Sequence, residues 1–304
     1  MASTKIENAT YPDLDNNKLE SKYKIKRVDT PHGRAYYDRD TADETERAYF
    51  YGVTSILSAT LAKGVGYDMW LGNSLSYEHA MDYALSKADI GTAVHQLTMY
   101  LQWNNVVDCD TGFYNARLNK IDEITPGMKK MLQAYIDFYN DYRPAQVATE
   151  ISLYNPEMFK NKFGEGPKYP FAGTADSICT MPPTKEGGQP RLALIDLKTG
   201  KAYKSHELQL TAYKLLFDSL YGEEYGEIDD LYCLYVTPRG KYTLKKYKFV
   251  PEVWYNLLEI FFWNIQDGRG RQPVIKEKQE LPRYYALDEE QLKEKEEKKE
   301  DVGK

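Results

Sequence analysis

The chain contains little cysteine and no long hydrophobic run. Among its 304 residues there are only three cysteines, Cys109, Cys179 and Cys233. They are too few and too scattered for a disulfide framework or a four-cysteine zinc site, and this chain alone cannot supply the four cysteines of an iron–sulfur cluster. We expect them to be inert core residues. No stretch approaches the ~20 continuous apolar residues of a membrane span, and residues 1–8 lack the apolar run of a secretory signal. These absences predict a cytoplasmic protein without membrane contact.

Motifs of several other enzyme classes are also absent. The chain has no Gly-x-x-x-x-Gly-Lys-Ser/Thr phosphate loop, which argues against a fused ATP-driven motor. It has no Gly-x-Ser-x-Gly turn of serine hydrolases and no His-Glu-x-x-His zinc motif. Its composition, 42% apolar and 28% charged, is that of an ordinary globular protein.

The excess of acidic residues does not exclude nucleic acid as a partner. The formal charge of −6 at first argues against it, because nucleic-acid binding depends on Lys and Arg that neutralise phosphates. Residues 288–304, however, carry eight acids and five bases, a net −3, so half of the excess lies in a charged tail that we place at 286–304. Local charge therefore matters more than the total.

A basic segment with interleaved tyrosines runs from Lys241 to Lys248, just after Arg239. Such a segment is suited to follow a phosphate backbone, with Arg239, Lys241 and Lys245 as the contacts. The pattern is equally typical of a solvated edge strand that lysines protect from aggregation. Both interpretations stay open at this point.

Hydrophobic periodicity predicts an α/β fold with a helical part in its first half. A hairpin is expected at 23–28 and 34–37, and the helical part spans about 53–145 and ends near Arg143 and Pro144. Helices are expected to begin near Ser55 and to lie at 67–71, 91–101 and 127–139. After it the order is strand, strand, strand, helix, strand, which predicts a central mixed β-sheet flanked by helices.

The second half contains the expected sheet core, at about 146–250. Its elements are predicted as strands at 147–153, 173–180 and 191–197, a helix at 205–221, and a hairpin of 231–236 and 242–249. A last amphipathic helix is expected at about 252–266. We assign 1–20 to a flexible N-terminus and 21–285 to a single domain.

Two aspartates and a lysine lie on these strands in a pattern that suits metal-dependent cleavage of a phosphodiester. The two-residue period of a strand places Asp196 and Lys198 on one face, and burying either alone costs several kcal/mol unless something compensates the charge. Asp176 lies on the preceding strand, after Gly173, whose missing side chain permits a bulge or a close approach. Carboxylates hold Mg²⁺ or Mn²⁺, and a lysine orients or activates the attacking water.

The following helix contributes Gln209 and Tyr213, which are four residues apart and share one face at the edge of an apolar stripe. Tyr213 is also consistent with ordinary core packing and Gln209 with a backbone contact. His95 alone is more typical of a buried, hydrogen-bonded histidine than of a ligand, and Glu150 alternates with apolar neighbours and equally suits a position in water. His32, His79 and His206 show no partner pattern, and we interpret them as structural.

Taken together, these residues resemble a known family. Its motifs are matched by the set Gly91-x-x-x-His95, Glu150, Gly173-Thr-Ala-Asp176, Asp196-x-Lys198 and Gln209-x-x-x-Tyr213, with Gly52-Val-Thr-Ser-Ile-Leu57 before the first helix. The set is similar to the PD-(D/E)XK nuclease superfamily, specifically its RecB-like exonuclease branch, which includes phage recombination and mitochondrial genome maintenance exonucleases. The resemblance covers about residues 20–265. It implies a restriction-endonuclease-like core at 146–250.

The resemblance also implies roles for individual residues. Asp176 and Asp196 would bridge one or two Mg²⁺ or Mn²⁺ ions, joined by the backbone carbonyl of Leu197 and by His95. Lys198 would position or activate the water. Glu150 would be an outer-shell or second-metal carboxylate. Gln209 and Tyr213 would support the site and the nucleic-acid strand. Asp at 196 departs from the more frequent Glu by one methylene, and the iron–sulfur subtype is excluded because its cysteines are missing.

The predicted function is a metal-dependent DNA exonuclease in recombination, repair or replication, acting on single- or double-stranded DNA with ends. A helicase or a single-strand annealing protein is a partner by family analogy only. Two alternatives remain: a structure- or sequence-specific DNA endonuclease, and a catalytically silent nucleic-acid-binding protein of the same fold. The second alternative predicts a damaged motif set, whereas Asp176, Asp196 and Lys198 are all present.

Overall fold

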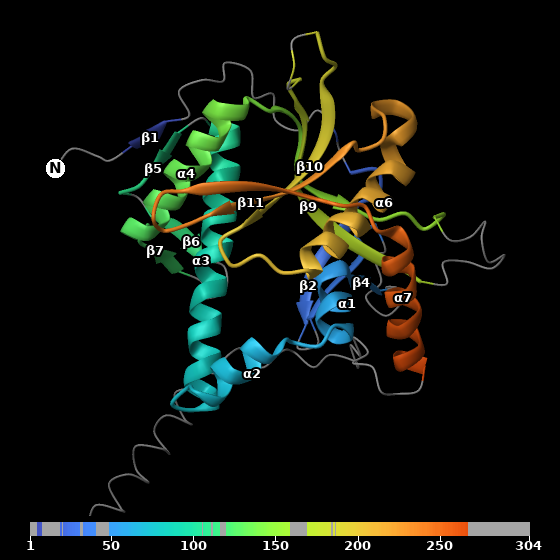
Figure 1. Cartoon of the computed structure of the whole chain (residues 1–304), viewed down its shortest axis with the longest axis horizontal. Coiled ribbons are helices and arrows are strands. Elements are labelled where there is room, and N and C mark those ends of the chain that lie inside the picture. Colours follow the sequence, from blue (N-terminus) through green and yellow to red (C-terminus); the bar gives the residue numbers. More distant parts are fainter. Residues whose placement is uncertain are drawn as a thin grey trace, which may run out of the picture.

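The computed structural model shows an α/β architecture with helices on both faces of a sheet (Figure 1). It describes residues 5–7, 19, 21–30, 33–40, 49–104, 106–110, 112–115, 120–158, 169–183, 185 and 187–266. The expected charged tail, most of the expected flexible N-terminus, and His32 lie outside the described residues.

The main sheet has eight strands and mixed direction. Its order is β12-β11-β10-β9-β4-β3-β2, and β8 pairs with β9 beside this path. The pairs β10–β11 and β4–β9 are parallel and the others antiparallel. The strands are β2 (Ile25–Thr30), β3 (Gly33–Asp38), β4 (Tyr49–Gly52), β8 (Ala145–Leu153), β9 (Phe171–Met181), β10 (Arg191–Lys198), β11 (Asp230–Val236) and β12 (Tyr242–Tyr247).

Helices pack on both faces of this sheet and enclose two hydrophobic cores. On one face lie α1 (Val53–Thr60), α6 (Ser205–Tyr225) and α7 (Pro251–Gln266), where Trp254 is completely buried. On the other face lie α3 (Tyr77–Asn104) and α4 (Pro126–Tyr142), where Leu132 is completely buried. The predicted mixed sheet flanked by helices is confirmed, and the N-terminal hairpin (β2 and β3) is part of that sheet.

Local signals set the ends of α4. The side chain of Thr125 accepts a hydrogen bond from Met128 N at 3.3 Å, and Pro126 occupies the first turn, where its missing N–H costs nothing. The helix ends where Arg143 adopts a left-handed backbone with φ of 44°, immediately before Pro144. This is the end that the sequence predicts.

Several elements differ from the sequence-based expectation. The helix expected at 91–101 begins at Tyr77, and α2 (Val65–Gly72) precedes it without a single buried residue. Four short strands were not expected, and β1 falls in the segment predicted to be flexible. They are β1 (Lys5–Glu7), β5 (Val106–Asp108), β6 (Phe113–Asn115) and β7 (Lys120–Asp122), with β1 paired to β5. Three residues are too few to show an alternating pattern, and β4 was missed for a similar reason.

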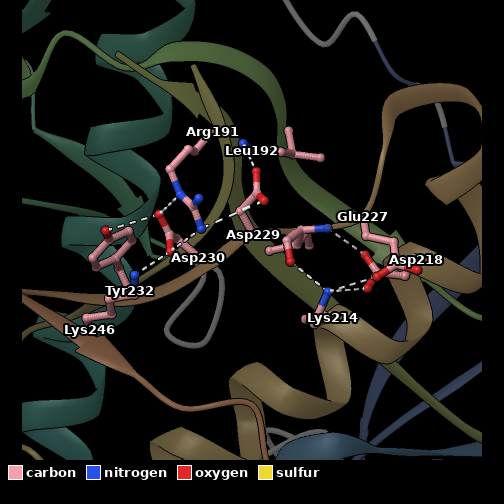
Figure 2. A network of polar contacts seen from close by, with 10 residues as sticks. Arg191, Leu192, Lys214, Asp218, Glu227, Asp229, Asp230, Tyr232 and Lys246 are labelled. Carbon is pink, nitrogen blue, oxygen red and sulfur yellow. Dashed lines mark hydrogen bonds and ion pairs between the residues drawn. The ribbon is translucent and has the colours of Figure 1, made fainter. Parts of the chain in front are cut away.

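A network of charged side chains ties α6, β10 and β11 together (Figure 2). Lys214 in α6 donates to the carbonyl of Ile228 at 2.6 Å and pairs with Asp218, which accepts from Ile228 N at 2.8 Å. At the start of β10, Arg191 donates to Asp230 at 2.8 Å. The contacts of Lys214 and Asp218 fix α6 to the segment that leads into β11, and the contact of Arg191 joins β10 to β11.

No helix of the described segments is long and apolar enough to cross a membrane.

Candidate active site

The strands β9 and β10 separate where the two aspartates lie. Their antiparallel ladder ends with Ile195 opposite Ser177, and Asp196 and Asp176 follow it. Leu197 N then donates a hydrogen bond to Oδ2 of Asp176 at 2.8 Å. The N–H of Leu197 is therefore bonded to the side chain of Asp176 and not to a backbone carbonyl of the neighbouring strand. Both aspartates therefore lie where the pairing of the two strands ends.

Glu150 reaches the same place from the opposite edge of β9. The residues on either side of it in β8 pair with the residues on either side of Asp176, so the two acids lie opposite each other. The backbone of Glu150 has φ of 51°, and the described residues include only one other non-glycine residue with positive φ, Arg143. Such a backbone costs about 1–3 kcal/mol and is frequent at functional sites. This strain supports a functional position for Glu150 rather than the solvent-facing one that its strand pattern also allowed.

His95 approaches both acids from α3. Its Nδ1 lies 3.5 Å from Oδ2 of Asp176 and 3.7 Å from Oε1 of Glu150. Burial by itself lowers the pKa of His95, but the negative charges of Asp176 and Glu150 outweigh it and raise that pKa from 6.5 to about 9. One turn earlier in the helix, a Cβ on Gly91 would lie 3.3 Å from Thr199, so this position keeps α3 close to the end of β10.

Asp196 is held from three sides. It forms an ion pair with Lys198, accepts a hydrogen bond from Nε2 of Gln209 at 3.2 Å and lies 3.8 Å from Sγ of Cys233. This ion pair requires both side chains to lie on the same face of β10, as the two-residue strand period predicts. Only 1% of the Asp196 residue is exposed, so its charge is compensated by these neighbours and not by bulk water.

Gln209 and Tyr213 support the site from α6. The same Nε2 of Gln209 also donates to the hydroxyl of Tyr213 at 3.1 Å. A Cβ at Gly173 would lie 2.3 Å from the Tyr213 ring, so only glycine lets α6 approach β9 this closely. Gln209 and Tyr213 are 7% and 2% exposed, which leaves little surface for the direct contact with nucleic acid that the family resemblance also implied. Gln209 contacts Asp196 instead, and Tyr213 contacts Gln209.

Burial and charge repulsion raise the pKa of the two aspartates. Burial is the largest influence on both Asp176 and Asp196 and raises the pKa of each, although His95 and Lys198 act in the opposite direction. Burial alone would lower the pKa of Lys198, but Asp196 and Asp176 outweigh it and raise that pKa above 10.5. Lys198 is therefore an ammonium cation at neutral pH.

The donor atoms fit a divalent cation. One ligand atom each from His95, Glu150 and Asp176 lie within 4.8 Å of one another. Two carboxylates and an imidazole suit Mn²⁺, and the carboxylates suit Mg²⁺. The carboxylate of Asp196 is not a member of this group of three; its neighbours are Lys198 and Gln209. The expected ligand set thus divides into a His95–Glu150–Asp176 cluster and the adjacent Asp196–Lys198 pair.

A family model confirms what this arrangement indicates. The model of the PD-(D/E)XK nuclease superfamily matches residues 70–302. The chain belongs to this superfamily. The match includes His95, Glu150, Asp176, Asp196 and Lys198, and it implies a hydrolytic nuclease that acts with a divalent metal. Comparison with curated proteins gave no match.

The basic residues expected to contact DNA occupy two different places in this nuclease. Lys245 is the ladder partner of Cys233, and Cys233 is the ladder partner of Asp196, so the side chains of these three residues share one face of the sheet. Arg239 lies in the turn between β11 and β12, and Lys241 follows that turn, at the edge of the sheet. Of the three, Lys245 is the one that the ladder aligns with the site.

The environment of His206 beside the site could not be predicted from its sequence pattern. Its Nδ1 lies 2.7 Å from the hydroxyl of Tyr235, the ladder partner of Lys198. Burial, followed by the charge of Lys198, lowers the pKa of His206 to about 4, so the imidazole is neutral. No spacing rule joins His206 to Tyr235, because β11 brings the tyrosine from 29 residues away. The only signal was its place soon after Lys198.

Proposed function

We propose that the chain is a metal-dependent DNA exonuclease of the RecB-like branch, with residues 21–285 as one nuclease domain. The observation that carries the proposal is the cluster of His95, Glu150 and Asp176 beside the Asp196–Lys198 pair, at the opening between β9 and β10. The family match supports nuclease chemistry. The Gly91–His95 turn of α3 and the Gln209–Tyr213 turn of α6 support the exonuclease branch over a restriction-type endonuclease.

In this proposal the acids and the imidazole hold the cation. His95, Glu150 and Asp176 supply donor atoms, and Asp196 with the Leu197 carbonyl supplies further oxygens on the β10 side. A divalent cation in this place stabilises the negative charge that develops on the phosphate during hydrolysis. The strained backbone of Glu150 and the hydrogen bond from Leu197 N hold two of these carboxylates in place before any substrate arrives.

Lys198 acts as a fixed positive charge. Because Asp196 and Asp176 keep it protonated, it donates hydrogen bonds to the attacking water or to a phosphate oxygen and does not serve as a base in this state. Gln209 orients Asp196, and Tyr213 in turn orients Gln209. In-line attack of water on phosphorus breaks the bond to the leaving oxygen, which takes up a proton, and we infer that it leaves a 5′-phosphate.

The metal preference follows from the imidazole. Because a nitrogen ligand suits softer ions better than it suits Mg²⁺, we expect Mn²⁺ to support activity at least as well as Mg²⁺. Steady-state rates with each ion over a concentration series measure this. A clear preference for Mg²⁺ counts against His95 as a ligand.

The deciding experiment compares end-labelled linear single- and double-stranded DNA with a closed circle, in Mn²⁺, Mg²⁺ or EDTA. We expect metal-dependent loss of linear DNA only, abolished in Asp196→Asn, with a melting curve to show that this variant is folded. The position of the label reveals the direction of digestion. Cleavage of the circle identifies an endonuclease, and binding without cleavage of any substrate identifies a silent binding protein.

A further inference from the structure

An aromatic stack leads from the Asp196–Lys198 pair to the surface. Tyr235 is the ladder partner of Lys198, and the His206 ring stacks on it with ring centroids 5.9 Å apart and an interplanar angle of 30°. Tyr203 packs edge-on against His206 with centroids 5.7 Å apart. Of these rings Tyr203 lies outermost and is 60% exposed. None of the roles assigned above uses it.

The inner members of this stack are rigidly held. The hydroxyl of Tyr235 lies 2.7 Å from Nδ1 of His206 and 2.7 Å from the hydroxyl of Tyr247 on β12. Strands β11 and β12 therefore fix the ring against which Tyr203 packs. A ring supported in this way offers a preformed flat surface, and ordering it on binding costs little conformational entropy.

The charge around Tyr203 suits a polyanion. The segment from Lys198 to Lys204 contains three lysines and no acid. Lys198 pairs with Asp196 and Lys204 with Glu207, and Lys201 is exposed. Lys245 projects from β12 on the sheet face that also carries Asp196, and its Nζ lies 4.8 Å from the centre of the Tyr247 ring. An exposed aromatic ring among lysines is the combination that binds single strands through base stacking and phosphate contacts.

An exposed tyrosine on α3 lacks this combination. Tyr77 at the start of α3 is 66% exposed, but Glu78 follows it directly and Asp82 lies one turn further along. It also precedes His95 by eighteen residues, which is ~27 Å along a helix. Tyr77 is thus a matched control: equally exposed, equally aromatic and far from the site.

We propose that Tyr203 is a stacking platform for an unpaired base of the substrate strand, close to the phosphate that is cleaved. The inference rests on the proposed nuclease function and specifies its substrate: the strand that enters the site is single-stranded at this point. Lys201 and Lys245 lie where they can contact the flanking phosphates. Tyr203 contributes to strand binding, while the bond cleavage belongs to the residues between β9 and β10.

The test measures binding separately from cleavage. Single-stranded oligonucleotides carry 2-aminopurine at each of the four nucleotides nearest the cleaved end, and binding is followed by fluorescence in EDTA, where no hydrolysis takes place. Wild type should quench the probe at one or two positions. Tyr203→Ala should lose that quenching and bind about 5- to 150-fold more weakly, the range expected for one stacked base.

Three further variants separate stacking from other effects. Tyr203→Trp should keep the quenching, Tyr203→Leu should lose it although it retains apolar surface, and Tyr77→Ala should match wild type. In cleavage assays Tyr203→Ala should raise KM with little change in kcat. Melting temperatures confirm that each variant is folded.

The proposal is overturned if wild type shows no position-dependent quenching, if Tyr203→Ala binds like wild type, or if Tyr77→Ala is equally impaired. Its failure is distinguishable from that of the proposed function. Quenching that depends on Tyr203, in a protein that cleaves no DNA, overturns the nuclease proposal alone. Metal-dependent cleavage that is unchanged in Tyr203→Ala overturns the stacking proposal alone.

Discussion

Lys198 and Lys245 lie on one face of the sheet in different surroundings. Lys198 is 21% exposed and paired with the almost completely buried Asp196, whereas Lys245 is exposed on the edge strand β12. In the proposed function the first acts on the reacting phosphate, and the second contacts the strand alongside it. Substitution of the two should therefore affect different kinetic constants.

We predict that Lys198→Ala lowers kcat by about 10²–10³-fold, the loss typical of a preorganised donor in an active site, with a much smaller change in DNA affinity. Lys245→Ala should leave kcat nearly unchanged, raise KM, and reduce the salt dependence of binding by about one phosphate contact. Steady-state kinetics and titrations at several salt concentrations measure both. Equal losses of turnover and affinity in Lys198→Ala would show that Lys198 mainly binds DNA.

Gly173 shows how a missing side chain supports the site. A Cβ there would meet the Tyr213 ring at 2.3 Å, and this ring is only 2% exposed and has no room to move. We predict that Gly173→Ala destabilises the fold by about 1–3 kcal/mol through overpacking and lowers activity by displacing Gln209 from Asp196. Urea unfolding and cleavage rates measure these effects. Gly72→Ala, where nothing lies within 4 Å, is the control and should change neither.

At the scale of elements, the fold fixes α6 through the network of Figure 2. Asp218 pairs with Lys214 of the same helix and accepts from Ile228 N in the segment that enters β11. Both side chains of this ion pair are largely buried, and removal of Asp218 leaves Lys214 with the Ile228 carbonyl and the carboxylate of Glu227 at 3.9 Å. The helix that carries Gln209 and Tyr213 thus depends on contacts outside the site.

We predict that Asp218→Ala lowers the free energy of unfolding by about 2–3 kcal/mol, because hydrogen bonds to charged groups are lost. The cleavage rate well below the melting temperature should stay close to that of wild type. Asp137→Ala is the control: Asp137 makes an exposed contact with Gln133 one turn away, and its loss should change stability by less than about 0.5 kcal/mol. A cleavage rate that falls at temperatures where the variant is fully folded would show that the network acts on the chemistry.

At the scale of the whole molecule, the site makes stability depend on pH. Burial raises the pKa of Asp176 and Asp196, so the stability linked to their protonated forms falls as pH rises through the raised values. The charges of Asp176 and Glu150 raise the pKa of His95 to about 9 against the lowering effect of burial. Its contribution is fully present below pH 6.5 and is lost as pH rises through about 9. Both effects lower the stability of the fold as pH rises.

We therefore predict that the melting temperature in EDTA declines between pH 6.5 and about 9. Mn²⁺ should raise it more at the alkaline end, because the cation replaces the protons that the cluster has lost. His95→Gln should flatten part of the decline and weaken the effect of Mn²⁺. Calorimetry across the pH series measures this, and a melting temperature in EDTA that rises over the range would contradict the assignment of charges.

Sequence and structure agree best where a signal is local. The ends of α4, the hairpin of β2 and β3, and the common face of Asp196 and Lys198 follow from capping, turn residues and the two-residue strand period. The short strands, β4 and the first half of α3 were missed. In β4 only four residues are paired, and one of its two partner strands, β9, is more than a hundred residues away.

The sequence by itself determined the family, the order of the motifs, and which residue types are available for chemistry. Only the tertiary structure decided that Glu150 faces His95 and Asp176, that Gln209 reaches Asp196, and that His206 lies against Tyr235. The physical reason is register. Local propensity sets the period of a strand or helix, but the packing of distant segments determines which residues of neighbouring elements meet.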